Sequence, residues 1–131
     1  MLKVSTKGRY ALRAVIDLAD HSEKGHVYLK DIARRQDLSI KYLEAIFTKL
    51  KKKGLLKSRR GVKGGYALAR PAKALSVHDI VTAMEGPLSI VPCVFHGNCA
   101  RIKRCRTKSL WADLTRQIET IMKKTLVADF L

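Results

Sequence analysis

Hydrophobic residues recur at helical spacing in five stretches of this chain. These stretches are residues 6–21, 31–36, 39–53, 76–86 and 107–127. Apolar side chains fall three or four positions apart in them, which predicts amphipathic helices. Two shorter stretches, residues 55–59 and 66–69, are typical of strands, and the glycines between them permit the positive φ that a tight turn demands. The pattern predicts a mainly α fold with a small β-hairpin.

Two of the predicted helices have the spacing of a helix-turn-helix, because only Asp37 and Leu38 separate residues 31–36 from residues 39–53. In the second of these helices, one stripe that we expect to face the core contains Ile40, Leu43, Phe47 and Leu50. The opposite, exposed side contains Lys41, Tyr42, Ala45, Thr48, Lys49 and Lys52. Three helices followed by a hairpin define a winged helix-turn-helix, whose third helix enters the major groove while the hairpin contacts the flanking backbone or the minor groove.

The chain has 131 residues, which is the size of one compact domain. Within it, residues 1–72 are predicted to form the winged helix-turn-helix DNA-binding region. Residues 73–131 are predicted to form a cysteine-containing loop and a long C-terminal dimerisation helix. Because a groove-reading domain usually works as two copies, we expect a coiled-coil-like seam on that helix to be the dimer interface. The seam consists of Trp111, Leu114, Ile118 and Ile121.

The charge of the chain points to a polyanionic partner. There are 27 Lys and Arg residues against 11 Asp and Glu residues, which leaves a formal net charge of +16. Residues 41–63 are the most basic part, with Glu44 as their single acid. So large an excess of one charge favours nucleic acid as the partner. No stretch is long and apolar enough for a membrane span or a signal peptide, so we expect a cytoplasmic protein that does not bind membranes.

The predicted DNA contacts fall into two groups. Lys41, Tyr42 and Glu44 are expected to read base edges, since an acid beside phosphates is repulsive unless it accepts a hydrogen bond from a base such as cytosine. A second group on the helix and the wing is expected mainly to contact the DNA backbone. That group consists of Lys49, Lys52, Arg59, Arg60 and Lys63. The expected partner is a near-palindromic double-stranded operator.

Three cysteines follow the spacing C-x5-C-x5-C at Cys93, Cys99 and Cys105. Six residues of α-helix rotate a side chain by about 240°, so an unbroken helix would keep the thiols apart, and we expect a loop. Three thiolates around one point form most of an iron–sulfur site, and an acid-free cationic stretch would favour both the thiolates and an anionic cluster. The cations are Arg101, Lys103, Arg104, Arg106 and Lys108.

Other uses of this loop stay open from the residues alone. Zinc is one, because His96 lies between Cys93 and Cys99 at knuckle-like spacing and Cys105 completes a Cys3His set. Inert or peroxide-sensing thiols are another. A competing function is a basic RNA-binding or ribosome-associated protein with a zinc-stabilised loop. An enzyme is not expected, because the sequence has no P-loop, no G-x-S-x-G, no paired carboxylates and no C-x-x-C pair.

Four features of the sequence carry a family resemblance. They are residues 5–11 (STKGRYA), the 39–50 helix with Tyr42-Leu43-Glu44, the RGVKGGY wing at 60–66 and the three cysteines. Together they resemble the IscR/NsrR family of bacterial regulators over nearly the whole chain. The resemblance implies a homodimeric winged-helix transcription factor with a [2Fe-2S] or [4Fe-4S] cluster in the cysteine loop. It also implies a repressor whose cluster state sets DNA affinity and which controls cluster biogenesis or a related stress response.

The resemblance leaves the fourth cluster ligand open. In the IscR branch a histidine three residues after the third cysteine is the fourth ligand, whereas this chain has Lys108 there. The NsrR branch resembles a design with an acidic ligand from the partner's first helix, whereas the matching residues 8–10 here are Gly-Arg-Tyr. The remaining candidates are His96, Glu85, a residue of the partner subunit, and an exogenous water or thiol.

Overall fold

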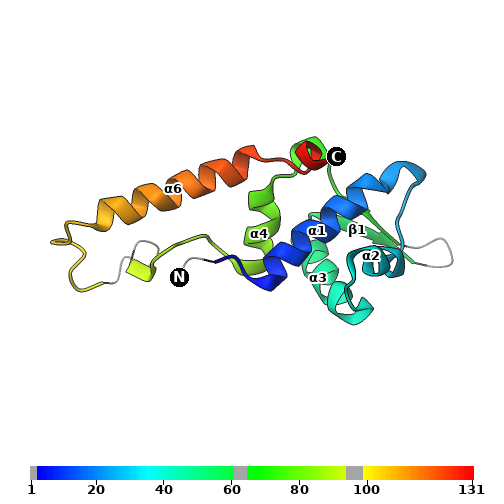
Figure 1. Cartoon of the computed structure of the whole chain (residues 1–131), viewed down its shortest axis with the longest axis horizontal. Coiled ribbons are helices and arrows are strands. Elements are labelled where there is room, and N and C mark those ends of the chain that lie inside the picture. The colour runs from blue at the N-terminus through cyan, green and yellow to red at the C-terminus, as the bar shows by residue number, and fades with distance from the viewer. Residues whose placement is uncertain (1–2, 61–64, 94–98) are drawn as a thin grey trace.

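The computed structural model describes residues 3–60, 65–93 and 99–131. Its helices are α1 (Thr6–Asp20), α2 (Leu29–Gln36), α3 (Ile40–Lys52), α4 (Val77–Glu85) and α6 (Lys108–Lys124). Two strands, β1 (Leu56–Arg59) and β2 (Gly65–Leu68), form an antiparallel hairpin between α3 and α4 (Figure 1). Short 3₁₀ turns cover Ser22–Lys24, Ala72–Ala74 and Val127–Phe130. The mainly α fold with a small hairpin is therefore confirmed.

Two element boundaries differ from the predicted ones by two or more residues, and several others differ by one. Helix α2 begins at Leu29, two residues before the predicted start, with Tyr28 as its N-cap. Helix α6 ends at Lys124, because the chain after it is extended and pairs with the segment before α4. Val77 N–H donates to Thr125 O at 2.9 Å, and Val127 N–H donates to Leu75 O at 2.8 Å. This pairing overrides the apolar periodicity, which continues to Val127.

The turn between α2 and α3 is built from local chemistry. Asp37 adopts the left-handed conformation with φ of 54°, a geometry that Asp tolerates better than most residues. Ser39 then caps α3, since its hydroxyl accepts a hydrogen bond from Tyr42 N–H at 3.0 Å. The helix-turn-helix predicted from the two-residue spacing is confirmed.

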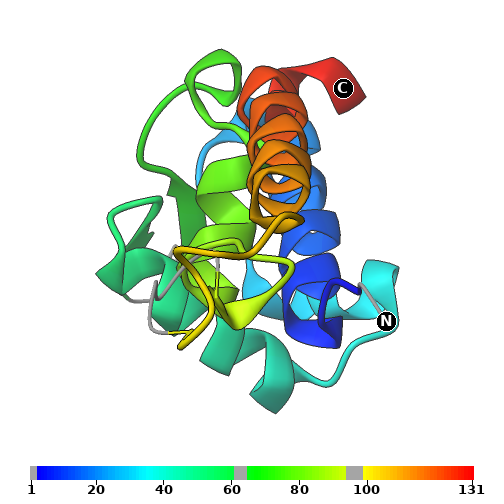
Figure 2. The same ribbon diagram turned by 90° about the vertical axis from the view of Figure 1, so that its left-hand side faces the viewer.

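The core is centred on α1, which packs against α2, α3 and α4 (Figure 2). Helix α3 contributes Leu43, Ile46, Phe47 and Leu50 to it. Ile40 was predicted to join this stripe but is 53% exposed at the first position of α3. Ile46, which is 2% exposed, takes the corresponding place in the core, so the buried stripe follows positions 43, 46, 47 and 50.

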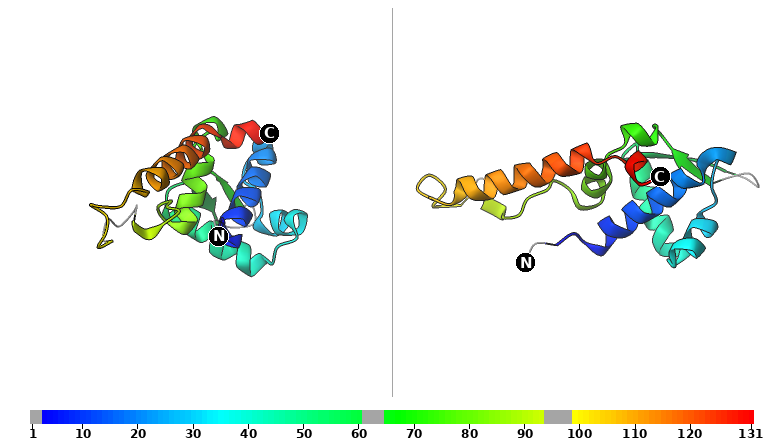
Figure 3. Two further views of the ribbon diagram at one scale, coloured as in Figure 1. Left: turned by 60° about the vertical axis from the view of Figure 1, so that its left-hand side comes forward. Right: turned by 45° about the horizontal axis from the view of Figure 1, so that its top comes forward.

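Helix α6 extends away from the winged-helix body, as both views in Figure 3 show. The N-terminus of α6 and the segment before it lie at the far end, and its C-terminus returns to α4 (Figure 1). Thr115 is the only residue of α6 that is buried. Among the described helices, none is both long and apolar enough to cross a membrane.

Candidate nucleic-acid interface and cysteine loop

The outward face of α3 presents most of the predicted DNA contacts. Lys41, Glu44 and Lys52 are exposed on it. Within the described part of the chain, Glu44 forms no ion pair, so an intrahelical pair with a lysine does not account for it. An unpaired acid on this cationic face remains available to a hydrogen-bond donor from outside the chain.

Two residues of α3 are placed differently from the prediction. Tyr42 is half-buried, because its ring packs edge-to-face against Tyr10 of α1 at a centroid distance of 6.1 Å. Lys49 is on the exposed side, but its ammonium donates a hydrogen bond to Met84 O at 3.0 Å. Tyr42 therefore offers only part of its side chain to a partner, and Lys49 is held at the C-terminus of α4.

The wing is held in place by contacts at both of its strands. Lys51 Nζ donates to Ser58 Oγ at 2.6 Å, which ties α3 to β1. Val27 and Tyr66 exchange two backbone hydrogen bonds of 2.8 Å, which tie β2 to the segment before α2. Gly65 has φ of 125°, and a Cβ there would lie 2.5 Å from Val27 O, so this approach requires glycine.

The wing's predicted DNA contacts lie at the end of its first strand. Arg59 ends β1 opposite Gly65, Arg60 follows it, and both are exposed. Lys63 lies outside the described residues. The two arginines are therefore presented at the hairpin tip, on a strand whose position relative to α3 is fixed.

A buried carboxylate that sequence reasoning missed fixes the helix-turn-helix to α1. Asp17 is 6% exposed and accepts hydrogen bonds from Arg35 Nε and Nη2 at 3.1 and 2.7 Å and from Gln36 Nε2 at 2.9 Å. Burial raises the pKa of Asp17, but the hydrogen bonds from Arg35 and Gln36 outweigh it and hold the pKa below its usual value. The signal in the sequence was an acid within the buried stripe of α1.

Arg13 adds a second tie between α1 and the end of α2. Its guanidinium donates to Gln36 O at 2.6 Å and to Gln36 Oε1 at 3.2 Å, and it lies 5.1 Å from the centre of the Tyr10 ring. The same Tyr10 ring contacts Tyr42 of α3. One face of α1 thus positions both the turn and the start of the recognition helix.

The described cysteines are free thiols on two segments at the same end of the molecule (Figure 1). Cys93 and Cys105 are half-buried and Cys99 is exposed. From Cys99 to Thr107 the chain consists of turns, as predicted for a ligand loop. Within the described residues no three metal-binding side chains are gathered at one point. His96, the predicted candidate for a zinc set, lies outside the described residues.

Cys105 lies three residues before Lys108, the first residue of α6. Its Sγ is 3.3 Å from Thr107 Oγ1. The hydroxyl of Thr107, followed by the backbone N–H groups of Thr107 and Lys108, lowers the pKa of the Cys105 thiol. Thiolate, the form that binds metals, is therefore favoured at this position.

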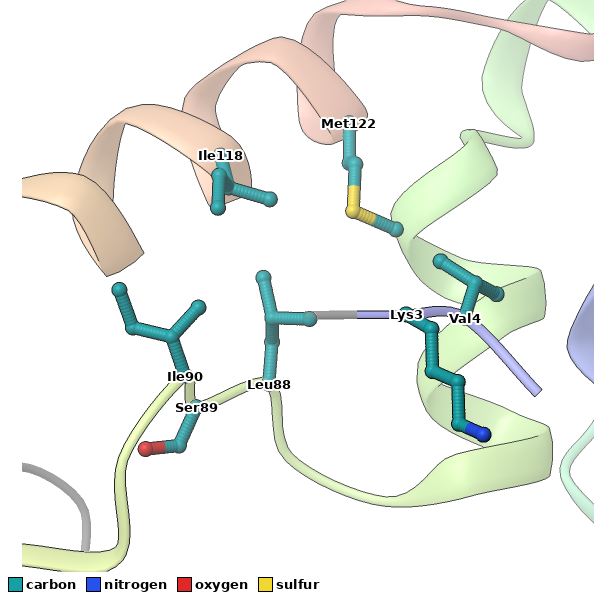
Figure 4. A pocket seen from close by; sticks show the side chains of 7 residues that line it. All are labelled: Lys3, Val4, Leu88, Ser89, Ile90, Ile118 and Met122. Atoms are coloured by element: carbon teal, nitrogen blue, oxygen red, sulfur yellow. The ribbon is translucent and has the colours of Figure 1, made fainter. Parts of the chain in front are cut away.

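The segment that leads to Cys93 crosses under α6. Ile118 and Met122 project from α6 toward Leu88 and Ile90, with the chain near Val4 beside them (Figure 4). Together with Lys3 and Ser89 these residues line a cavity of about 410 Å³. The packing between α6 and the cysteine segment is therefore loose.

The predicted seam on α6 is divided between two environments. Ile118 lines the open pocket beneath α6, Trp111 and Leu114 are half-buried, and Ile121 is 66% exposed. Leu110, which was not in the predicted seam, is 49% exposed beside them. The apolar side chains of α6 that are open to a partner are thus Leu110 and Ile121, whereas Ile118 faces the pocket formed by its own chain.

One candidate for the fourth ligand, Glu85, has a partner within the chain, and Lys108 replaces the histidine of the IscR branch. Glu85 Oε1 accepts a hydrogen bond from Ser5 N–H at 2.6 Å, so its carboxylate is directed to the start of α1. Lys108 is the exposed first residue of α6.

Comparison with known proteins gives consistent matches over the full length. The family model Rrf2, described as an iron-dependent transcriptional regulator, matches residues 4–131. An HTH-type transcriptional regulator of Haemophilus influenzae is 40% identical over 130 residues, which cover 99% of this chain and 87% of that protein. The HTH-type transcriptional regulator IscR of Yersinia pestis is 38% identical over 130 residues, which cover 99% of this chain and 79% of that protein.

Solved structures give the same result. The structure of T. potens IscR superposes with a TM-score of 0.80 at 42% identity and covers 98% of this chain and 85% of its own. CymR of B. subtilis, described as the global cysteine regulator, superposes with a TM-score of 0.83 at 37% identity and covers 99% of this chain and 96% of its own. The winged helix-turn-helix, the hairpin wing and the long C-terminal helix are thus accounted for, and the chain belongs to the Rrf2 family as a transcriptional regulator of the Rrf2/IscR type and not an enzyme.

Proposed function

We propose that this regulator binds a near-palindromic DNA operator as a homodimer, and that an iron–sulfur cluster on Cys93, Cys99 and Cys105 controls its affinity. The observation that carries the proposal is the set of three free thiols on the two described segments that precede α6. A likeness to proteins named IscR supports it. The expected output is repression of genes for cluster biogenesis or a related stress response.

The residues around the thiols fit an anionic cluster. The stretch from Arg101 to Lys108 carries five cations and no acid. All five of these cations are exposed, so they can neutralise negative charge on thiolates and cluster together. The three cysteines would hold the cluster, and a bound cluster would supply a redox-active iron centre. With Glu85 directed to α1, the proposed fourth ligand is a residue of the partner subunit, an exogenous water or thiol, or His96, which lies outside the described residues.

DNA recognition in this proposal divides along the two surfaces described above. Lys41 and Glu44, together with the accessible part of Tyr42, would read base edges from α3. Lys52, Arg59 and Arg60 would contact phosphates, as would Lys49 near the end of α3 and Lys63, which lies outside the described residues. Support comes from their exposure on two elements that Lys51 and Ser58 tie together.

A homodimer would bring two of these surfaces onto one duplex. Its interface would use the seam of Trp111, Leu114, Ile118 and Ile121, extended by Leu110. The apolar side chains that α6 leaves exposed support this choice, because burying them against a partner would remove apolar surface from water.

Anaerobic purification followed by iron and acid-labile sulfide analysis tests the cluster directly. We expect iron and sulfide in comparable amounts and a visible absorption that Cys105→Ala abolishes while the fold is retained. A protein that carries stoichiometric zinc and no iron would contradict the cluster, although DNA binding would still stand.

A further inference from the structure

The N-terminus of α1 and the C-terminus of α4 are among the helix ends that lack a residue of complementary charge in their own terminal turn. Helix α1 has no acidic residue in its first turn, and α4 has no basic residue in its last turn. Negative charge is favourable at a helix N-terminus and positive charge at a C-terminus. In both cases a residue far away in the sequence supplies it, and the two contacts meet at the corner formed by Met84 and Glu85.

Glu85 supplies the acid for α1. Its Oε1 accepts a hydrogen bond from Ser5 N–H at 2.6 Å, across 80 positions of sequence. The same oxygen faces Gly8, where an added Cβ would lie 2.6 Å from it. The start of α1 therefore contacts the side chain of Glu85, the last residue of α4.

Lys49 supplies the cation for α4. It lies in the last turn of α3, and its ammonium donates to Met84 O at 3.0 Å in a partly buried position. Helices α3 and α1 are thus hydrogen-bonded to the adjacent residues Met84 and Glu85 at the C-terminus of α4.

The corner is also joined to the cysteine segment. Gly86, with φ of 83°, ends α4, and the chain runs from there to Cys93, eight positions after Glu85. On the way Leu88 and Ile90 line the cavity with Ile118 of α6 and with Val4, the residue before Ser5. A shift of this segment can therefore displace Met84 and Glu85 in two ways. It can act along the backbone through Gly86, or through the packing of Leu88 and Ile90 near Val4.

We propose that Glu85 and Lys49 are positioning residues that transmit the state of the cysteine loop to the DNA-reading surface. This inference rests on the proposed function. A shift of residues 86–90 would move the C-terminus of α4, and with it the start of α1 and the ammonium of Lys49. Such a path carries a signal only to the extent that the two loop states favour different arrangements of the corner.

The test measures the affinity of iron-loaded and metal-free protein for one duplex, by anaerobic fluorescence anisotropy. The probe is a duplex selected by the wild-type protein from a random-sequence pool. The variants are Glu85→Ala, Glu85→Gln and Lys49→Met, with Lys52→Met as the matched control on the same helix. The quantity compared is the ratio of the DNA affinities of the iron-loaded and metal-free forms. In allosteric proteins this ratio is typically about 5- to 150-fold.

We expect the ratio to fall to within about twofold of one in Glu85→Ala and Lys49→Met, well below the range of a working switch. Glu85→Gln should retain part of it, because the amide oxygen still accepts from Ser5 N–H. Lys52→Met should weaken both forms alike and leave the ratio unchanged. Iron content should stay at the wild-type level in all four variants, since none of the substituted residues is a proposed ligand.

A second readout does not require the cluster. In metal-free protein, Glu85→Ala should speed hydrogen exchange at the backbone amides of residues 5–9, whereas Lys52→Met should not. The inference is overturned if Glu85→Ala and Lys49→Met keep the wild-type affinity ratio, or if Glu85→Ala leaves the hydrogen exchange of residues 5–9 unchanged. The proposed function would survive either result. Equal binding by the loaded and metal-free wild-type protein would overturn the proposed function and this inference together.

Discussion

The winged-helix region and the α6 region differ in how much of their apolar surface the chain covers by itself. Helix α3 buries Leu43, Ile46, Phe47 and Leu50. Helix α6 is longer, yet Thr115 is its only buried residue, and Ile121 stays 66% exposed. The DNA-reading half is therefore complete within one chain. The α6 region has apolar side chains left exposed and an open pocket beside the segment that leads to Cys93, and the proposed dimer and cluster would complete it.

The largest expected effect is in the region that the chain completes alone. Phe47 is fully buried and packs edge-to-face on Tyr66 at 5.0 Å. Phe47→Ala should lower the free energy of unfolding by about 3 to 5 kcal/mol, because it removes buried apolar area and leaves a cavity. Thr48→Ala, at the exposed next position of α3, is the control and should change it by less than about 0.5 kcal/mol. Urea unfolding followed by circular dichroism measures both, and equal losses would contradict the assigned core.

The second prediction concerns the region that we propose a partner completes. Leu114→Asp combined with Ile121→Asp should convert a dimer to a monomer, because two unpaired carboxylates would be buried at the interface and Ile121 is 66% exposed in the single chain. Thr120→Asp, on the polar face of α6, should leave the dimer intact. Analytical ultracentrifugation at micromolar concentration distinguishes the two states. A wild-type monomer, or a dimer that survives the double substitution, would remove the proposed interface.

The third prediction uses the buried carboxylate of the reading half. Asp17→Asn should cost about 1 to 3 kcal/mol of unfolding free energy at neutral pH, since it removes the charge that Arg35 pairs with. Because the folded pKa of Asp17 lies below its unfolded value of about 3.9, this stability is present above that pH and is lost as the pH falls through the folded pKa.

The difference between wild type and Asp17→Asn should therefore shrink below about pH 4, where the unfolded carboxyl begins to protonate. Urea midpoints measured from neutral to acidic pH test this. A difference that does not change with pH would show that the charge of Asp17 contributes nothing.

The smallest predicted effects separate two kinds of DNA contact within the reading half. Glu44→Ala should mainly alter sequence preference, by about 1 to 3 kcal/mol per site. Arg59→Ala should weaken all duplexes alike and reduce the slope of log affinity against log salt by about one unit. Competition binding with selected and scrambled duplexes measures both. Equal loss on every sequence for Glu44→Ala would contradict its role in base reading.

The sequence predicted what short-range patterns determine. The helix-turn-helix followed from two residues between periodic helices, and Ser39 and the hairpin glycines marked the start of α3 and the wing. The errors came from contacts between distant segments. Ile40 and Ile46 are both apolar on neighbouring parts of one helix, and the position of α1 decides which of them is buried.

The candidate site shows the same division. Residue type and spacing were enough to select the exposed cations of α3 and the wing and the three cysteines. The hydrogen bond from Lys49 to Met84, the packing of Tyr42 on Tyr10 and the buried Asp17 pair join elements 18 to 35 positions apart. No local pattern encodes these contacts, because each depends on how helices with separate patterns pack together.

Control of DNA affinity by the cysteine loop can be measured in a single titration. Iron-loaded and metal-free wild-type protein are compared on the same selected duplex under anaerobic conditions, with Cys105→Ala treated identically. The account predicts that the two wild-type forms differ by about 5- to 150-fold, whereas Cys105→Ala gives one affinity whether or not iron and sulfide are supplied. Equal affinities for the two wild-type forms, or a cluster-dependent difference that persists in Cys105→Ala, would contradict it.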